Sequence, residues 1–550
     1  MKKARITLLL ALLLFAHQAQ AQTPKTSKKT FKLNLTGWLT SLDPAFADQR
    51  TNIWAVTQLY NGLFSFSEDL HVHPQLAYMY EISEDGLTYT FTIKDKVFFH
   101  DDPAFANGQG REVTSDDFVY SFKRLMNPRT ASRGSWVFID KIKRDNDGKI
   151  ADDWVAKIDK YKFKITLARR FPAFLQILAM PFTFVVAKEA VEKYGKAFRR
   201  HPVGTGPFKL KTWNENEELI LVKNPKYWKR DIKYRQIPYL DAVQVSFVQD
   251  KNLVFRNFEQ KKLDFLTNVP ARQRPKILNK DGSIKKDFES KFAVEKKPFL
   301  MTEYVGFLLD GTNEKANPLL NLKVRKALSY AIDRKSLLAS TRQGLGTPGN
   351  LGFVPDAIAS YDSTRIRGYK FNVKKAQQLL REAGYSQGKG FPEITLNTYN
   401  GDQKIVAFLQ KQWKQHLGIQ VKTVSQQFVT HRDMVVNGKV NFFRSAWIAD
   451  YPDADNFLTL FYSKYVAPDG PNKTRFEDTT FDQLFIEARK TDNTFTRFAN
   501  YHKMDQIIVD QAPVIVLYYE QVLNLRQKNI TGAKTNAMNT LSLEKVDFKN

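Results

Sequence analysis

The residues with the most distinctive chemistry lie in the stretch RSAWIADYPDADNFL, residues 444–458. Three aspartates, Asp450, Asp453 and Asp455, lie there among aromatic side chains, in a chain whose net charge is +27. A carboxylate between aromatic walls can bind a cation through charge-assisted hydrogen bonds, which are the strong ones. The same stretch is also typical of a turn that leads into a helix. We assign Asp453 and Asp455 to turn and capping roles and keep Asp450 as the candidate binding acid.

Two other patterns resemble ligand sites but lack the context such sites need. GLGTPG, residues 344–349, matches G-x-G-x-x-G, yet it follows an expected helix and contains Pro348 where a helix should begin. It predicts a loop rather than a nucleotide site. His71 and His73 could face one side of a strand, but no further ligand cluster completes a metal site. We expect both to be exposed to solvent or hydrogen-bonded.

No pattern in the sequence assembles a catalytic site. G-x-S-x-G, H-E-x-x-H and P-loop motifs are missing, and acid pairs such as Asp116-Asp117 fall at helix starts, where acids are common without catalysis. The chain has no cysteine, which excludes disulfides, thiolate ligands and a lipid-modified N-terminal cysteine. The sequence therefore predicts a protein that is not an enzyme and holds no cofactor or metal.

The N-terminus predicts export. Basic residues precede the apolar run 6–16, and small residues follow it at Ala19 and Ala21. This pattern is typical of a cleaved signal peptide, residues 1–21, and the alternative is an uncleaved anchor helix. We expect a soluble periplasmic protein without a lipid anchor. The basic residues are spread along the chain, so no nucleic-acid partner is expected.

The elements that must position Asp450 belong to a large α/β protein. At 550 residues, the length is typical of about two to four domains. Residues 41–54 predict a loop and residues 55–62 a helix. Residues 321–340 predict a helix, because apolar residues from Leu322 to Ile332 have helical spacing, and Asn372 and Gly384 bound another helix. Helices alternate with strands in the second half, which predicts a largely parallel sheet there and a division into two lobes near residue 300. Ligands usually bind between such lobes.

Three long phrases resemble a known family. They are PQLAYMYEISEDGLTYTFTIKDKVFFHDD with VTSDDFVYSFKRLMNP, HPVGTGPFKLKTW with LVKNPKYW, and NPLLNLKVRKALSYAIDRKSLL. Together they resemble the extracellular solute-binding proteins of family 5, the substrate-binding components of ABC importers for peptides and, in some cases, nickel or haem. The resemblance covers essentially the whole chain after the predicted signal peptide.

This resemblance implies a bilobal periplasmic-binding-protein fold of the type II, or cluster C, class, with mixed sheets and an extra inserted subdomain. The first lobe would comprise residues 22–66, 200–292 and 510–550. The inserted subdomain would comprise residues 67–199 and the second lobe residues 293–509. The cargo would lie in the cleft between the lobes and be enclosed when they close.

The family's oligopeptide binders carry binding groups in the phrase R-x-x-W-x-A-D-Y, which stands here at the same spacing. By resemblance, Asp450 would pair with the N-terminal ammonium of a peptide. Arg444 would pair with the C-terminal carboxylate of a short peptide, or alternatively form an internal salt bridge. The backbone of Ala446, Trp447 and Ile448 would bind the peptide as an added strand.

Other positions follow the family less closely. Phe428 falls at an aromatic wall of the family's cleft, although Phe428 and Trp447 could also be ordinary core residues. Asp48 falls where the family has a glutamate, and Tyr304 is expected to line the pocket. Arg50 stands where the oligopeptide binders have a small apolar residue, and Gly134 stands where they have a tyrosine.

The sequence therefore predicts a monomeric periplasmic protein that captures short peptides and delivers them to an inner-membrane ABC permease. One alternative is the same fold with another cargo, such as a metal chelate, haem or a cell-wall peptide. A second alternative is a basic envelope enzyme or polyanion-binding protein, because the net charge is high.

Overall fold

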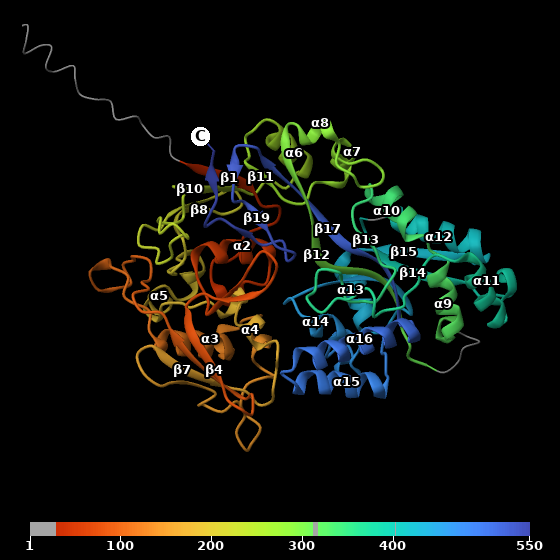
Figure 1. The fold of residues 1–550 in the computed structure, drawn as a ribbon, viewed down its shortest axis with the longest axis horizontal. Coiled ribbons are helices and arrows are strands. Elements are labelled where there is room, and N and C mark those ends of the chain that lie inside the picture. Colours follow the sequence, from red (N-terminus) through yellow and green to blue (C-terminus); the bar gives the residue numbers. More distant parts are fainter. Residues whose placement is uncertain (1–28, 312–316, 402, 550) are drawn as a thin grey trace, which may run out of the picture.

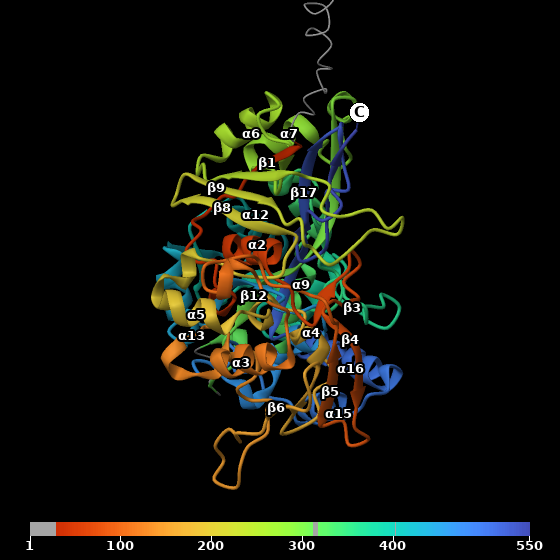
Figure 2. The same cartoon turned by 90° about the vertical axis from the view of Figure 1, so that its left-hand side faces the viewer.

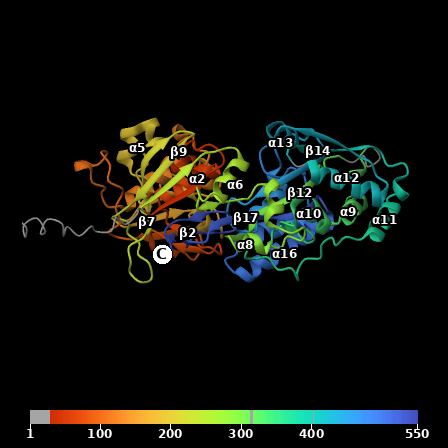
Figure 3. The ribbon, with the colours of Figure 1, turned by 90° about the horizontal axis from the view of Figure 1, so that it is seen from above.

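The computed structural model describes residues 29–311, 317–401 and 403–549; the predicted signal peptide, residues 1–21, lies outside these ranges. Two bodies lie side by side and are joined by the long strands β12 and β17 (Figures 1 and 3). One body holds the first lobe, with the inserted subdomain below it (Figure 2). The other body is the second lobe. No helix in the described ranges is long and apolar enough to cross a membrane.

A single 11-stranded sheet runs through both lobes in the order β15-β14-β16-β12-β17-β11-β1-β10-β9-β8, with β13 beside β17. The first-lobe strands are β1 (Thr30–Asn34), β8 (Phe208–Asn214), β9 (Glu218–Lys223), β10 (Ala242–Ser246) and β11 (Phe265–Leu266). The second-lobe strands are β13 (Thr347–Pro348), β14 (Ile394–Tyr399), β15 (Val421–Gln426) and β16 (Phe442–Ile448). The strands common to both lobes are β12 (Phe292–Phe307) and β17 (Val514–Gln527).

The lobes are connected where β12 and β17 pass from one to the other. The register of this antiparallel pair shifts between Pro298 and Thr302. Phe292 packs with Leu523 in a first-lobe cluster, whereas Val305 packs in the second-lobe core. A proline lacks the N–H that a ladder needs, so an irregularity at this point is expected. The two strands thus pass from one lobe to the other between Phe292 and Val305.

The prediction of a largely parallel sheet in the second lobe is wrong for the strands that connect the lobes, which pair in the antiparallel sense. β14 pairs in parallel with β15 and with β16, but β12 is antiparallel to both β16 and β17. The reason is topological, because β12 enters from the first lobe and β17 returns toward it. Both strands therefore add antiparallel neighbours to a parallel core.

Two predicted helix boundaries also change. The expected single helix over residues 321–340 is divided into α9 (Leu322–Tyr330) and α10 (Arg334–Arg342), because the side chain of Asp333 caps α10. The helix expected over residues 55–62 begins earlier, as α2 (Arg50–Leu59). The remaining long helices of the lobes are α6 (Lys251–Glu259), α11 (Val373–Glu382), α12 (Gln403–Leu417), α13 (Phe428–Val436), α15 (Thr479–Lys490) and α16 (Thr494–Gln511), with the shorter α7 (Arg274–Ile277), α8 (Lys286–Glu289) and α14 (Asp455–Leu458). The expected cap of α11 by Asn372 is confirmed.

The inserted subdomain is built on a four-stranded sheet in the order β4-β5-β7-β6. Its elements are β3 (Val72–Pro74), β4 (Ala77–Ile82), β5 (Thr88–Ile93), β6 (Val155–Lys157), β7 (Lys162–Thr166), α3 (Ser115–Met126), α4 (Phe174–Ile177) and α5 (Lys188–Tyr194). The short strand β2 (Phe64–Phe66), at the end of the preceding first-lobe segment, pairs with β3. β5 alternates between half-buried and buried residues, which confirms the predicted half-buried strand.

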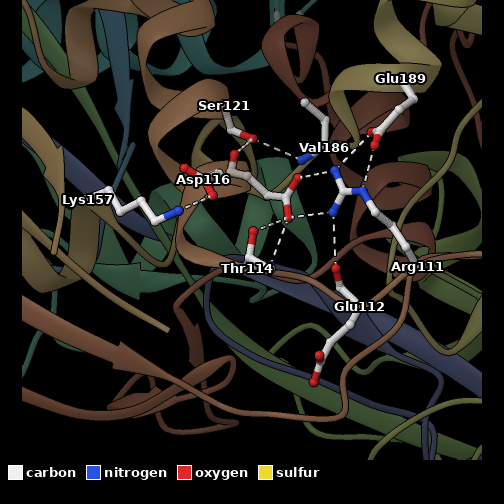
Figure 4. A network of polar contacts seen from close by, with 9 residues as sticks. Arg111, Glu112, Thr114, Asp116, Ser121, Lys157, Val186 and Glu189 are labelled. Carbon is white, nitrogen blue, oxygen red and sulfur yellow. Dashed lines mark hydrogen bonds and ion pairs between the residues drawn. The ribbon is translucent and has the colours of Figure 1, made fainter. Parts of the chain in front are cut away.

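Residues 114–117, with the sequence TSDD, have a structural role, which can be followed in Figure 4. Thr114 and Asp117 form a capping box at the start of α3. Arg111 donates to both carboxylate oxygens of Asp117, at 2.7 and 2.9 Å, and to those of Glu189, at 2.6 and 2.9 Å. One guanidinium thus joins the start of α3 to α5. Asp117 therefore stabilises the subdomain, as expected for a carboxylate at a helix start.

Candidate ligand-binding site

Two adjoining cavities lie where the three parts of the molecule meet. One has a volume of about 590 Å³ and the other about 380 Å³. Both are lined by Asp450, and they share further lining residues from the first lobe and the inserted subdomain: Ala47, Ile53, Met180, Phe182, Met538 and Thr540. Because the walls come from all three parts, a ligand held here would bridge the lobes. We call these two cavities the Asp450 cleft.

The loop after β16 brings Asp450 to the cleft. The Asn456 amide donates to the Asp450 carboxylate at 3.4 Å, and the Asp450 backbone N–H donates to the Asn456 side-chain oxygen at 3.1 Å. Trp447 Nε1 donates to that same oxygen at 3.0 Å, so the indole orients the amide. No cation among the described residues lies within ion-pair distance of Asp450.

Asp450 is exposed to solvent in the cleft, yet protein surrounds it closely on several sides. This desolvation raises the pKa of its carboxyl, and the hydrogen bond from Asn456 offsets only part of the rise. A carboxylate in this situation gains from a cationic partner, because the partner replaces the solvation that it has lost.

The other two aspartates of the segment are already satisfied. Asp453 accepts from the backbone N–H of Asp455 at 2.9 Å and thus holds the turn, as expected. Asp455 is buried and accepts from Arg489 at 2.6 and 2.8 Å and from the Tyr451 hydroxyl at 2.7 Å. It begins α14 but acts as an internal ion-pair partner, which the capping assignment did not include.

β16 has one edge that is only partly paired, and of this strand only its last residue, Ile448, lines the cleft. Along Phe442–Ile448 it pairs with β12, whereas on its other side β14 pairs with it only at Asn397↔Phe443. His431 Nε2 donates to the Arg444 carbonyl at 2.8 Å. Beyond that point, no described strand pairs with the free edge of residues 446–448. Such an edge carries unpaired N–H and C=O groups that an extended chain can bind.

Arg444 lies inside the second lobe rather than in the cleft. Its Nε donates to Glu303 at 2.6 Å, and both side chains are 1% exposed. Its guanidinium also lies over the ring of Tyr399, at 4.8 Å. The sequence left an internal salt bridge open as the alternative for Arg444, and the geometry is of that kind. The ligand role of Arg444 forms no part of our proposal.

Tyr304 and Phe428 line neither cavity. Tyr304 is buried against Phe353, with ring centroids 5.2 Å apart, and burial raises its pKa to about 12. Phe428 begins α13, is 60% exposed and meets Tyr399 edge-on at 5.5 Å. Trp447 is half-buried and acts through Asn456.

Asp48, in contrast, lines the smaller cavity with Ile448. Its carboxylate pairs with Arg133 at 3.1 Å, but the arginine side chain is 76% exposed, so the pair stabilises the fold little. A Cβ on Gly134 would lie 2.2 Å from the ring of Phe182. The glycine therefore leaves room for Phe182 to form a cleft wall, in place of the tyrosine expected from the family.

Several wall residues were missed from the sequence. The inserted subdomain contributes Met180 and Phe182, and the segment near the C-terminus contributes Met538 and Thr540. They carry no motif, and only the fold brings them beside Asp450. Arg50 was noted from the sequence as a departure, and it lines the smaller cavity.

Among the described residues, no group of three or more His, Cys, Asp or Glu side chains is arranged so that it could hold a metal ion. His71 contacts Asp69 at 2.9 Å and is exposed, which agrees with a hydrogen-bonded surface histidine.

Comparison with known families identifies the chain. A family model described as "Bacterial extracellular solute-binding proteins, family 5 Middle" matches residues 71–469. The chain belongs to this family. The family consists of solute-binding proteins, so the expectation of binding without catalysis is confirmed.

Relatives within the family cover nearly the whole chain. The glutathione-binding protein GsiB of Salmonella paratyphi A is 30% identical over 501 residues, covering 90% of this chain and 89% of its own length. The oligopeptide-binding protein OppA of Bacillus subtilis is 28% identical over 525 residues, covering 92% and 90%.

Solved structures confirm the predicted fold class. The unliganded open form of the periplasmic murein tripeptide binding protein MppA has a TM-score of 0.78 and 26% identity, covering 95% of this chain and 98% of that one. The periplasmic binding protein DppA from Helicobacter pylori, in complex with the peptide STSA, has a TM-score of 0.72 and 25% identity, covering 95% and 98%.

Proposed function

We propose that this protein is the periplasmic substrate-binding component of an ABC importer and that it captures short peptides with a free N-terminal amine. The observation that carries the proposal is Asp450, a cleft carboxylate that has a raised pKa and no cationic partner among the described residues. The names of the relatives support a peptide cargo, and they include glutathione, itself a tripeptide with a free amine.

The amine is the one positive charge that peptides of any sequence share. Enclosing it between the lobes is costly unless it is paired and hydrogen-bonded. Asp450 supplies the opposite charge, and Asn456 holds that carboxylate in place. Recognition of this group would be independent of the side chains of the cargo.

The free edge of β16 supports main-chain recognition. A peptide beside residues 446–448 would extend the sheet on the side opposite β12. Main-chain bonds give affinity without reading side chains, whereas the adjoining cavities give selectivity. One ion pair, a few main-chain bonds and lobe closure would together account for roughly −8 to −12 kcal/mol, the range of micromolar to nanomolar binding.

Closure and delivery complete the proposed function. The two strands β12 and β17 form the connection about which the lobes would move. A ligand that contacts both walls favours the closed state by its differential affinity for that state. We propose that the closed, monomeric protein docks on an inner-membrane permease.

Native mass spectrometry of protein purified from the periplasm tests this function directly. We expect co-purified species with the masses of short peptides, which are lost after unfolding and refolding. A bound haem, a metal chelate or another non-peptide mass would contradict the peptide cargo. Retention on heparin at physiological salt without any peptide binding would instead favour the polyanion alternative.

A further inference from the structure

A second feature of the cleft lies at the start of α2. Arg50 is the first residue of this ten-residue helix, its N-cap Gln49 makes no side-chain cap, and the first turn holds no acidic residue. The positive end of the helix dipole and a guanidinium therefore coincide. No acidic residue in that first turn compensates the positive charge of the helix end or of Arg50.

The guanidinium of Arg50 has no acidic partner among the described residues. It lies over the ring of Phe299, 5.9 Å from the centroid. Asp48, the nearby cleft acid, is already paired with Arg133. Arg50 is open to solvent at the cavity, but the protein around it displaces part of its hydration, and this desolvation lowers its pKa.

Arg50 also lines a third cavity of about 210 Å³, which shares Arg50, Trp54, Asn539 and Leu541 with the Asp450 cleft. Its other lining residues are apolar, hydroxyl or amide side chains and one lysine, Lys251. No carboxylate lines this cavity, whereas two cations, Arg50 and Lys251, do. We call it the Arg50 pocket.

An unpaired donor lies in the wall of the Arg50 pocket. Trp54 is 6% exposed, and its Nε1–H has no hydrogen-bond acceptor among the described residues. Most buried polar groups in folded proteins are hydrogen-bonded, so an unpaired one needs an explanation. The Nε1 atom of Trp54 is itself covered by protein, so the described polar groups that give this cavity its positive charge are the Arg50 guanidinium and the Lys251 ammonium.

We propose that the Arg50 pocket binds a carboxylate of the cargo while Asp450 binds its amine. This inference rests on the proposed function and narrows it to peptides that carry an acidic group at a fixed distance from the amine. The carboxylate is either the C-terminus of a short peptide or an acidic side chain. Arg50 pairs with it, and Lys251 adds charge at the pocket.

This role differs from a purely structural one. If Arg50 served only to pack on Phe299, its replacement would change the binding of all peptides alike, through stability. A carboxylate subsite instead makes the replacement selective for ligands that carry the anion. Matched ligands separate the two roles within one variant.

The test uses the full-length mature protein and isothermal titration with matched tripeptides. The panel comprises trialanine, its C-terminal amide, and tripeptides that place one glutamate or one glutamine at each position. We expect the wild type to prefer the acid of at least one pair by about tenfold or more. Arg50→Gln should remove that preference and leave the affinity for the neutral member within about threefold.

Arg256→Gln is the matched control, because it removes one exposed positive charge from α6 outside the cleft. It should keep the preference of the wild type. The acid/amide pair and the Glu/Gln pairs distinguish a C-terminal carboxylate from a side-chain one. Equal affinities for every matched pair, or a preference that survives Arg50→Gln, would overturn the inference and leave the proposed function standing. Failure of the whole panel to bind would overturn both.

Discussion

Asp450 and Asp455 belong to one short segment, yet their surroundings are opposite. Asp455 is buried where the second lobe meets the inserted subdomain, and Arg489 and Tyr451 satisfy it. Asp450 faces the cleft with one amide donor and no cation among the described residues. Burial alone would raise the pKa of Asp455, but the charge and hydrogen bonds of Arg489 outweigh it and lower the pKa. The pKa of Asp450 is instead raised.

The contrast separates an acid that stabilises the fold from an acid that remains available for a ligand. The inner ion pair fixes the start of α14, and Asn456 of that helix in turn holds Asp450. The same division appears among the arginines, since Arg444 pairs inside the lobe with Glu303 whereas Arg50 faces the cleft. The position of the ligand-accessible Asp450 carboxylate thus depends on neighbouring residues whose own polar groups are already paired.

The largest effect is expected from breaking the inner pair. Arg489→Met leaves the buried Asp455 carboxylate without its cation, which should lower the free energy of unfolding by about 3–5 kcal/mol. Urea denaturation followed by circular dichroism measures this loss. Arg169→Met, which removes a partly exposed arginine, should cost under about 1 kcal/mol. Equal losses in the two variants would mean that the buried pair stabilises the fold no more than an exposed ion pair does.

The next largest effect concerns the cleft acid. Asp450→Asn should weaken peptide binding about tenfold or more, because the charged partner of the ligand amine is lost. The ligand-free melting temperature should change little, because the carboxylate stabilises no cation of the protein itself. Asp469→Asn, at an exposed loop acid, is the control and should change neither quantity. Unchanged affinity in Asp450→Asn would remove Asp450 from the site.

A smaller effect should follow from the support of Asp450. Trp447→Phe keeps the ring but deletes the Nε1 donor to Asn456, so the amide that orients the carboxylate gains freedom. We expect affinity to fall about threefold to fivefold, the scale of one neutral hydrogen bond. Titration calorimetry at one temperature is sufficient. An effect as large as that of Asp450→Asn would mean that the indole contacts the ligand directly.

The smallest effect is a pH dependence. Because the pKa of Asp450 is raised, a protonated fraction persists above the ordinary carboxyl range. A peptide ammonium pairs only with the charged carboxylate, so affinity should rise with pH over part of the interval from about pH 4 to pH 7 and then level off. Titrations across this interval should show the rise in the wild type and lose it in Asp450→Asn. For the ligand-free protein the sign is opposite, because ionisation of an acid with a raised pKa opposes folding.

Local sequence signals predicted much of the secondary structure. The helix starts predicted at Asp116-Asp117 and at Asn372 are real, because the signals of a helix start depend on a few adjacent residues. The break at Asp333 was missed because the apolar residues that predicted the helix continue up to Ile332, directly before the break. The antiparallel placement of β12 and β17 was missed because helix–strand alternation does not show that two strands cross between lobes.

The site could be predicted only in part. The sequence placed Asp48, Ile448 and Asp450, which the structure brings into one cavity. It gave no basis for choosing between the two roles of Arg444, because the partner Glu303 is far away in the sequence and only the pairing of β12 with β16 brings it close. The walls from Phe182 and Met538 depend on how the subdomain and the C-terminal segment fold back on the cleft. No short-range pattern encodes that arrangement.

The most direct measurement compares one bound tripeptide with its N-acetylated form. Titration calorimetry with the wild type and Asp450→Asn isolates the interaction between the ligand amine and the cleft acid. The account predicts that acetylation weakens binding to the wild type about tenfold or more and changes binding to Asp450→Asn little. Equal affinity of the wild type for the two forms would contradict it.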